Sequence, residues 1–127
     1  MKNNKKGFTL IELVIIIAVL AVIAAIAIPT TTKIIGQAND KTDKANFALA
    51  QAAMEQYYSE NSSYPANITT AQTAVKSMTK DGTVPSCKVS GYKFYYVYAD
   101  FTGHKTGDVV YANANPGTAG TNCDALN

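Results

Sequence analysis

The chain begins with an apolar segment that is long enough to cross a lipid bilayer and that contains one acidic residue. Residues 8–28 are 21 consecutive positions at which almost every side chain is apolar. At the rise of an α-helix the segment is roughly 31 Å long, about the thickness of the hydrocarbon core, so it predicts a membrane-spanning helix. The exception is Glu12. An ionised carboxylate inside a bilayer costs on the order of 2.5–3.5 kcal/mol, so Glu12 needs a partner, a function, or hydration near the headgroups.

An ordinary secretory signal is the alternative interpretation of the N-terminus. Lys2, Lys5 and Lys6 would be its basic region, and Ala-Ile-Ala at residues 25–27 would be its cleavage site. The apolar region of such a signal is usually around 7–15 residues long, and it has no reason to carry an acid on its first turn. The sequence therefore favours a helix that stays attached to the chain.

Residues 6–13, Lys-Gly-Phe-Thr-Leu-Ile-Glu-Leu, resemble the N-terminus of type IV pilins and of their pseudopilin relatives. The resemblance combines a basic leader, the small residue Gly7, the aromatic Phe8, the acid Glu12 and an apolar run that ends at Pro29. It implies that a prepilin peptidase cuts between Gly7 and Phe8 on the cytoplasmic side. The new amine of Phe8 would then be N-methylated, and the leader would be lost.

The chemistry of these residues agrees with that processing. Basic residues before an apolar span keep its start on the cytoplasmic face, so Lys2, Lys5 and Lys6 place Phe8 inside and the rest of the chain outside. The resemblance implies that the ammonium of Phe8 pairs with Glu12 of a neighbouring subunit, so that two costly charges neutralise one another. Repeated from subunit to subunit, such a head-to-tail contact does not close and gives a helical filament.

The charges of the chain are divided between the leader and the remainder. The chain has 11 Lys, no Arg and 9 acidic residues, and loss of the leader leaves eight Lys against nine acids. No basic cluster follows residue 44, so the sequence shows no electrostatic footprint for nucleic acid. Lys41 and Lys44 alternate with Asp40 and Asp43, and Asp40 has a favourable helical spacing to Lys44. We expect these four residues to lie on a solvated face.

Pro29 marks the end of the uniformly apolar segment. It removes one helical hydrogen bond, and the threonines at 30–32 and Gly36 that follow are weak helix formers. We expect a continuous but kinked helix in a lone subunit. The resemblance implies that this stretch unwinds in filaments, whereas a proline that only marks the exit from the membrane is the alternative. The expected organisation is a leader at residues 1–7, a transmembrane and filament-core helix at 8–35, and a globular head at 36–127.

Helical periodicity resumes from about residue 38 to residue 60, and its two faces differ in side-chain size. One stripe holds the larger side chains: Phe47, Ala50, Met54 and Tyr58. The opposite stripe holds the smaller ones: Ala45, Leu49, Ala52 and Gln56. We expect the large stripe to bury against the chain's own sheet. The small stripe is suited to close approach of another helix, although an alanine-rich solvent face has the same pattern.

Residues 57–65 resemble the end of the long helix in many pilins and pseudopilins, with paired aromatics and a closing Tyr-Pro. Ser62 stands where those proteins often have glycine. We expect Asn61 to take the left-handed conformation that ends the helix, since Pro65 cannot continue it.

The remaining sequence predicts a second helix and a small antiparallel sheet. Thr70 is the expected cap of a short helix that covers Ala71, Ala74, Val75 and Met78 and ends at Asp81-Gly82. Residues 92–98 predict a central strand with Tyr92, Phe94, Tyr96 and Tyr98 on one face. Residues 108–113 predict a second strand, and residues 87–89 a short edge strand. The expected fold is α+β, the "lollipop" of pilins, with a long N-terminal helix packed on this sheet.

The two cysteines, Cys87 and Cys123, lie in the part of the chain that the topology places outside the cytoplasm, where disulfides persist. We expect them to pair, which matches the C-terminal disulfide-bounded loop of the resembled family. Closing a loop of 37 residues would contribute roughly 3–4 kcal/mol on the chain-entropy model. Free thiols are the alternative. A zinc site is not supported, because the single His104 has no ligand-type spacing to the cysteines.

Motifs for catalysis or cofactor binding are scarce. The exported part has one histidine in an expected turn, no Gly-rich phosphate loop and no nucleophile elbow, so we expect no enzymatic activity. Asp100, Asp108 and Asp124 could gather around calcium, as acidic loops do in the major pseudopilins of type II secretion. Three scattered acids are a weak signal, and we predict no metal and no other cofactor.

The resemblance implies a structural subunit of a type IV pilus. It would cross the cytoplasmic membrane once, with its head outside, and then assemble with copies of itself and with the pilus machinery into an extracellular filament. A pseudopilin of type II secretion or of a DNA-uptake system, in a periplasmic or cell-wall pseudopilus, is the first alternative. A monomeric membrane-anchored binding domain is the second. Adhesion, twitching motility, DNA uptake and secretion depend on machinery that this chain does not encode.

Overall fold

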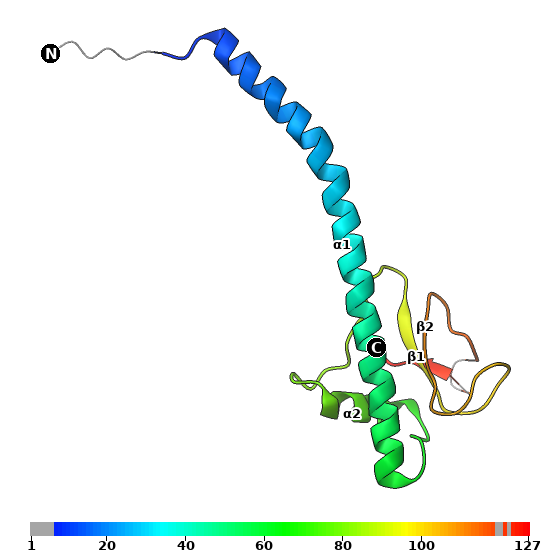
Figure 1. The fold of residues 1–127 in the computed structure, drawn as a ribbon. Helices are drawn as coiled ribbons and strands as arrows, with labels where there is room; N and C mark the ends of the chain where they lie inside the picture. Colours follow the sequence, from blue (N-terminus) through cyan, green and yellow to red (C-terminus); the bar gives the residue numbers. More distant parts are fainter. Residues whose placement is uncertain (1–6, 119–120, 122) are drawn as a thin grey trace. The chain divides into compact units, whose positions relative to one another are not determined.

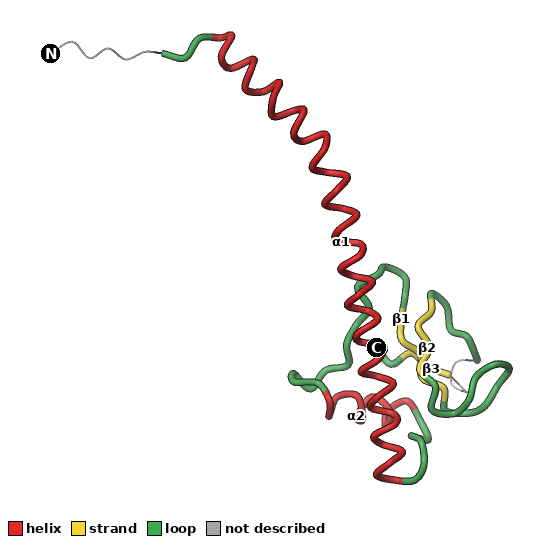
Figure 2. Tube along the Cα trace, in the orientation of Figure 1, coloured by secondary structure: helices red, strands yellow, loops and turns green. Residues whose placement is uncertain are grey.

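A computed structural model describes residues 7–118, 121 and 123–127. The element order is α1 (Leu10–Asn61), α2 (Ile68–Met78), β1 (Lys93–Val97), β2 (Val109–Ala112) and β3 (Cys123–Ala125) (Figures 1 and 2). The chain divides into two compact units, Met1–Gln37 and Ala38–Asn127, which we call unit 1 and unit 2. A long N-terminal helix packed with a three-stranded antiparallel sheet confirms the predicted α+β fold.

Unit 1 contains the apolar first half of α1. By length and composition α1 is suited to cross a membrane, and none of its most apolar window is buried within the described structure. Ile11 is 64% exposed and Ile26 is 69% exposed. Contiguous exposed apolar surface of this extent marks a membrane or protein interface.

The helix α1 continues through Pro29. Its α-helical assignment runs from Leu10 to Asn61 without a break, which confirms the predicted continuity. The threonines that follow Pro29 bond to main-chain carbonyls one turn back: Thr30 Oγ1 donates to Ile26 O at 3.1 Å and Thr31 Oγ1 to Ala27 O at 2.7 Å. These hydroxyls are thus satisfied by the helix itself, as is common for threonine in apolar helices. Unwinding in a filament stays a prediction.

The second half of α1 supplies one side of the core of unit 2. Ala50, Ala53 and Met54 are buried in one cluster with side chains of α2 and the sheet, and Phe47 packs against them. This confirms most of the predicted large stripe. Tyr58 is the exception, because it is 45% exposed and its ring packs on Tyr64 with a centroid separation of 4.7 Å.

The prediction for Leu49 is wrong. We placed it on the outward stripe of small residues, but its side chain packs against the core cluster that also contains Ala71 and Val75 of α2. Two partners, the sheet and α2, pack on this half of α1, so its buried arc is wider than a sheet alone requires. Ala45, Ala52 and Gln56 are exposed.

Both helix ends next to the connecting turn differ from the prediction by a few residues. Asn67, rather than Thr70, caps α2: its side-chain oxygen accepts a hydrogen bond from the main-chain N–H of Thr70 at 2.9 Å. Asparagine is among the best N-cap residues. At the end of α1, Ser62 takes the left-handed conformation with φ 55°, while Asn61 stays helical and donates its amide to Tyr57 O at 3.0 Å.

The sheet has the strand order β2-β1-β3, and both pairs are antiparallel. The two longer predicted strands are confirmed as β1 and β2. The predicted edge strand at residues 87–89 is wrong, and β3 occupies the third position. The physical reason is that the main-chain N–H groups of Lys88 and Val89 donate to the Asp43 carboxylate, at 2.6 and 2.9 Å, rather than to a neighbouring strand.

Alternate side chains of β1 enter different apolar clusters. Phe94 and Tyr96 belong to the cluster that contains α1, which confirms that the aromatic face packs on the helix. Tyr95 and Val97 point to the other face and form a second cluster with Cys123. The central strand is therefore covered on both faces.

Each sheet edge has a main-chain group that is bonded by a side chain. On β2, the N–H of Val109 donates to Gln51 Oε1 at 3.0 Å. On β3, the carbonyl of Cys123 accepts from Asn115 Nδ2 at 2.9 Å. Both edges are thus partly occupied from within unit 2.

The solvated face predicted for Asp40, Lys41, Asp43 and Lys44 is only partly confirmed. Lys44 and Asp40 form the expected ion pair at 2.9 Å and are exposed at the surface. Asp43, in contrast, is fully buried. Its oxygens accept from two main-chain N–H groups and from Tyr111 Oη at 3.1 Å, so the contacts of the loop and of β2 replace its water.

Candidate functional site

The start of α1 holds the predicted processing and assembly residues. Thr9 directly precedes the helix, and its hydroxyl oxygen accepts from the N–H of Glu12 at 3.3 Å. In return, Glu12 Oε2 accepts from the Thr9 N–H and from the Thr9 hydroxyl, both at 2.8 Å. This reciprocal pair is a capping box. It provides acceptors for N–H groups at the start of the helix, which have no partner within the helix itself. This matters in a membrane, because little water is available there to bond them.

Thr9 is a residue that the sequence analysis missed. The signal was present as a threonine three residues before a glutamate, at the head of an apolar run. The sequence analysis explained Glu12 by a partner in another subunit or by hydration near the headgroups, and not by a contact within its own helix. The structure shows that its carboxylate already has a partner in its own chain, and that it lies at the helix end where the macrodipole favours a negative charge.

The residues at the expected cleavage point are accessible. Gly7 is exposed, and a Cβ added there would meet no heavy atom within 4 Å. Phe8 is 84% exposed. The local structure therefore does not itself require glycine at position 7. The leader lysines Lys2, Lys5 and Lys6 lie outside the described residues.

The structure does not gather all predicted site residues in one place. Pro29 lies 17 residues after Glu12 in the same helix, roughly 26 Å along its axis. Cys87 and Cys123 belong to unit 2. The assembly residues are thus positions along one exposed helix rather than the walls of a cavity.

Cys87 and Cys123 are not bonded to one another in the structure, and their pairing stays a prediction. Cys87 packs against the cluster on the α1 face of the sheet, and Cys123 is buried in the cluster on the other face. The sheet separates the two sulfurs. Burial, together with the negative charge of Asp43, raises the pKa of the Cys87 thiol to about 11, so little reactive thiolate forms at neutral pH.

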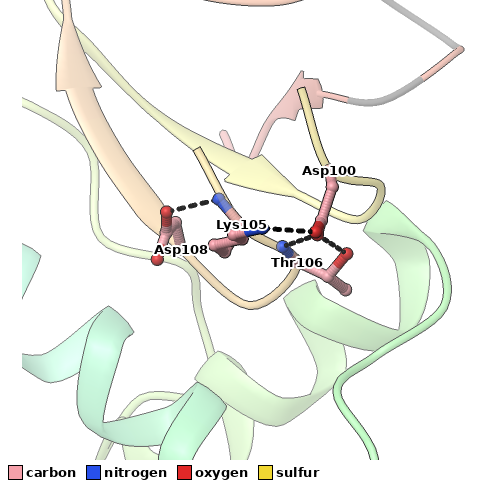
Figure 3. Close-up of polar contacts among 4 residues, drawn as sticks. All are labelled: Asp100, Lys105, Thr106 and Asp108. Atoms are coloured by element: carbon pink, nitrogen blue, oxygen red, sulfur yellow. Dashed lines mark hydrogen bonds and ion pairs between the residues drawn. The ribbon is translucent and has the colours of Figure 1, made fainter. Parts of the chain in front are cut away.

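The three aspartates considered for calcium are engaged by protein groups. Asp100 accepts from the N–H and hydroxyl of Thr106, at 2.7 and 2.8 Å, and from Lys105 Nζ at 3.1 Å (Figure 3). These bonds lower the pKa of Asp100 to about 2. Asp108 accepts from the Lys105 N–H, and Asp124 from Tyr98 Oη. Within the described part of the chain, no group of three His, Cys, Asp or Glu residues is placed to hold a metal ion.

The single histidine lies in a tight turn. His104 and Phe101 exchange main-chain hydrogen bonds at 2.9 and 3.2 Å, and their rings lie 4.9 Å apart. Among the described residues, the contacts of His104 are those with Phe101. The turn therefore holds the histidine as part of a small hairpin.

Comparison with known families assigns the N-terminus. Residues 2–28 match the family model described as the prokaryotic N-terminal methylation motif. This motif is the class III signal of type IV pilins and pseudopilins. No curated protein and no solved structure matches the chain at a significant level.

The motif and the exposed apolar helix together define a class of precursor. The chain carries the signal of a type IV pilin-like or pseudopilin precursor, which implies a structural subunit that is processed by a prepilin peptidase. Its apolar N-terminal helix fits anchorage in a membrane.

Proposed function

We propose that this chain is the major structural subunit of a type IV pilus. Cleavage between Gly7 and Phe8 produces a new ammonium at Phe8, and assembly buries the apolar first half of α1 among the same helices of neighbouring subunits. The observation that carries the proposal is the methylation motif at residues 2–28, joined to an apolar helix with no buried side chain in its most apolar window.

Burial supplies the driving force for assembly. Outside the membrane this apolar surface would meet water, so packing it against other helices is favourable. Small residues such as Ala21 and Ala25 let helices approach closely and gain van der Waals contacts. Glu12 supplies the register. Its carboxylate is held at the exposed start of α1, where the Phe8 ammonium of an adjacent subunit can neutralise it.

Mass spectrometry of the mature N-terminus tests the processing step. We expect a chain that begins at Phe8 and carries one methyl group on its amine. A chain that begins just after Ala27, at residues 28–30, would instead identify an ordinary secretory signal and would refute the pilin assignment.

Variants at the two capping-box residues test the registration step. We expect Glu12→Gln to insert in the membrane at normal levels but to reduce filaments strongly, because the negative charge is lost. Thr9→Val is the matched control: it removes the two capping bonds of the hydroxyl at a cost of about 0.5–2 kcal/mol, but keeps the carboxylate and the main-chain N–H that donates to it. If both variants lose filaments equally, Glu12 acts through the helix cap and not through intersubunit charge.

A pseudopilin of type II secretion or competence carries the same motif, so it is the second candidate. Deletion of the gene separates the two. Surface filaments that vanish on deletion indicate a pilin. Loss of protein export or of transformation, with no visible pili in the wild type, indicates a pseudopilin.

A further inference from the structure

Unit 2 has two ends that are defined by α1. We call the end where the unit begins the Ala38 end, and the end where α1 finishes the Asn61 end. The 24 helical residues between them extend about 36 Å. The charged side chains of unit 2 are divided unequally between these ends.

The Ala38 end is basic. Lys41 and Lys44 lie on the first turns of α1 in unit 2, and Lys88 is placed at the same level because its N–H bonds to Asp43. Lys93 starts β1 beside Phe94, whose ring packs on Tyr111, and Tyr111 reaches the same aspartate. The four lysines are exposed. The acids at this end are Asp40, which pairs with Lys44, and the buried Asp43.

The Asn61 end is acidic. Glu55 and Glu60 lie in the last two turns of α1, and both are exposed. The loop between β1 and β2 reaches the same end, because a Cβ on its Gly107 would lie 2.6 Å from the ring of Tyr64, whose hydroxyl bonds to Glu55. That loop carries two further carboxylates, Asp100 and Asp108 (Figure 3). Its one cation, Lys105, is paired with Asp100.

The two ends act as separate charges. At about 0.1 M salt the Debye length is about 10 Å, which is much shorter than the distance between the ends. Each end therefore attracts an opposite charge on another molecule instead of being cancelled within its own unit. Four lysines against two aspartates stand at one end. At the other, four carboxylates stand against Lys105 and against Lys76 of α2, whose neighbours Ala74 and Ser77 lie beside Glu60, while Lys80 and Asp81 after α2 add no net charge.

We infer that the Ala38 end of one copy of this chain docks against the Asn61 end of the next. The partner is a second copy, because this one molecule carries both complementary surfaces. A contact between two different patches of identical molecules is heterologous and repeats without closing, as a filament requires. The inference rests on the proposed function and adds a second contact, between heads, to the helix packing.

Charge reversal in the full-length chain tests this docking. The first variant, Lys41→Glu with Lys93→Glu, reverses the Ala38 end at two side chains that form no ion pair with any described residue. The second, Glu55→Gln with Ser59→Lys and Glu60→Lys, reverses the Asn61 end and leaves an acceptor for Tyr64. We expect each to lower the yield of sheared filaments about tenfold, since like charges then face one another. The combination of both should recover most of the yield.

Charge-conserving variants are the matched controls. Lys41→Arg with Lys93→Arg, and Glu60→Asp, should assemble like the wild type. Immunoblots of membranes measure accumulation of each variant, and protease resistance of the heads checks their folding. If Lys41→Glu with Lys93→Glu does not accumulate, the neutral variant Lys41→Gln with Lys93→Gln takes its place.

The outcomes separate this inference from the proposed function. If wild-type filaments form and the reversal variants assemble equally well, the docking of the two ends is refuted and the filament role stands. The same conclusion follows if the combined variant accumulates but stays as deficient as its parents. If the wild-type chain forms no filament under any condition, the proposed function fails and this inference fails with it.

Discussion

Asp43 shows how one residue can join elements that are far apart in the sequence. Its carboxylate connects α1 to the loop before β1 and to β2. Burial alone would raise the pKa of Asp43, but the hydrogen bonds from Lys88, Val89 and Tyr111 outweigh burial and lower it. Burial and the same carboxylate raise the pKa of Tyr111 to about 12. Over the physiological pH range Asp43 is therefore ionised and Tyr111 is neutral.

Asp43→Asn is expected to destabilise unit 2 by about 1–3 kcal/mol, because an amide cannot accept all the bonds of a carboxylate and leaves buried donors unsatisfied. The pH dependence follows from the lowered pKa. The contribution of Asp43 is fully present above its unfolded pKa of about 3.9 and is lost as pH falls through its folded value. Thermal unfolding of the wild type and the variant at pH 7 and at pH 3 measures this. A difference between them that does not shrink on acidification would contradict it.

Gly107 is the second residue with a clear requirement. Its φ is +100°, and an added Cβ would lie 2.6 Å from the Tyr64 ring. Gly107→Ala should therefore destabilise unit 2 by about 1–3 kcal/mol or more. Gly103→Ala is the control, because Gly103 has φ +83° but no neighbour within 4 Å, so it pays only the left-handed strain of about 1–2 kcal/mol. Urea unfolding compares them, and equal losses would mean that the Tyr64 contact contributes nothing.

At the scale of elements, local patterns predicted most of the fold. The apolar run and the size stripes gave α1, and the alternation of aromatic residues gave β1, because these periodicities report burial directly. Elements that depend on distant contacts were missed. The loop at 85–91 is not a strand because of Asp43, which lies more than 40 residues earlier, and β3 is only three residues, Cys-Asp-Ala, with little strand propensity.

The residues of the candidate site were likewise predictable where their signal is local in the sequence, and less so where it depends on distant contacts. Gly7, Phe8 and Glu12 were recognisable because their signal is contiguous in the sequence. The partner of Glu12 in its own helix was also local but was overlooked. The cysteine pairing was inferred from family resemblance and topology, and the face on which each cysteine lies depends on strand register, which two isolated cysteines do not reveal.

The position of β3 leads to a test of the thiols. In the structure the sheet separates Cys87 from Cys123. Alkylation in denaturant without a reductant should therefore label both residues in protein purified from membranes, as intact mass spectrometry would show. An unlabelled chain that takes up two labels only after reduction would demonstrate the disulfide, and would require Cys87 and Cys123 to lie on the same face of the sheet.

At the scale of the molecule, the apolar cores and the apolar span belong to different units. Both core clusters consist of unit 2 residues, between Phe47 and Leu126, whereas the large apolar side chains of unit 1 are exposed. The two parts therefore have different solvent requirements.

Residues 36–127 expressed alone should form a soluble, cooperatively unfolding monomer, because they retain every described core residue and lose the exposed apolar helix. Full-length protein should need detergent. Gel filtration and circular dichroism check both expectations. Aggregation of the shortened chain in the absence of detergent would show that the first half of α1 is needed to fold the head.

The side chains that occupy the sheet edges matter when many heads are crowded together on one surface. Free main-chain groups at a sheet edge invite neighbours to extend the sheet into an amyloid-like stack, and short edge strands such as β2 and β3 limit this risk. Gln51 and Asn115 each take up one such group, on opposite margins of the sheet. A neighbouring head therefore finds fewer free main-chain groups at either margin to which it could add a strand.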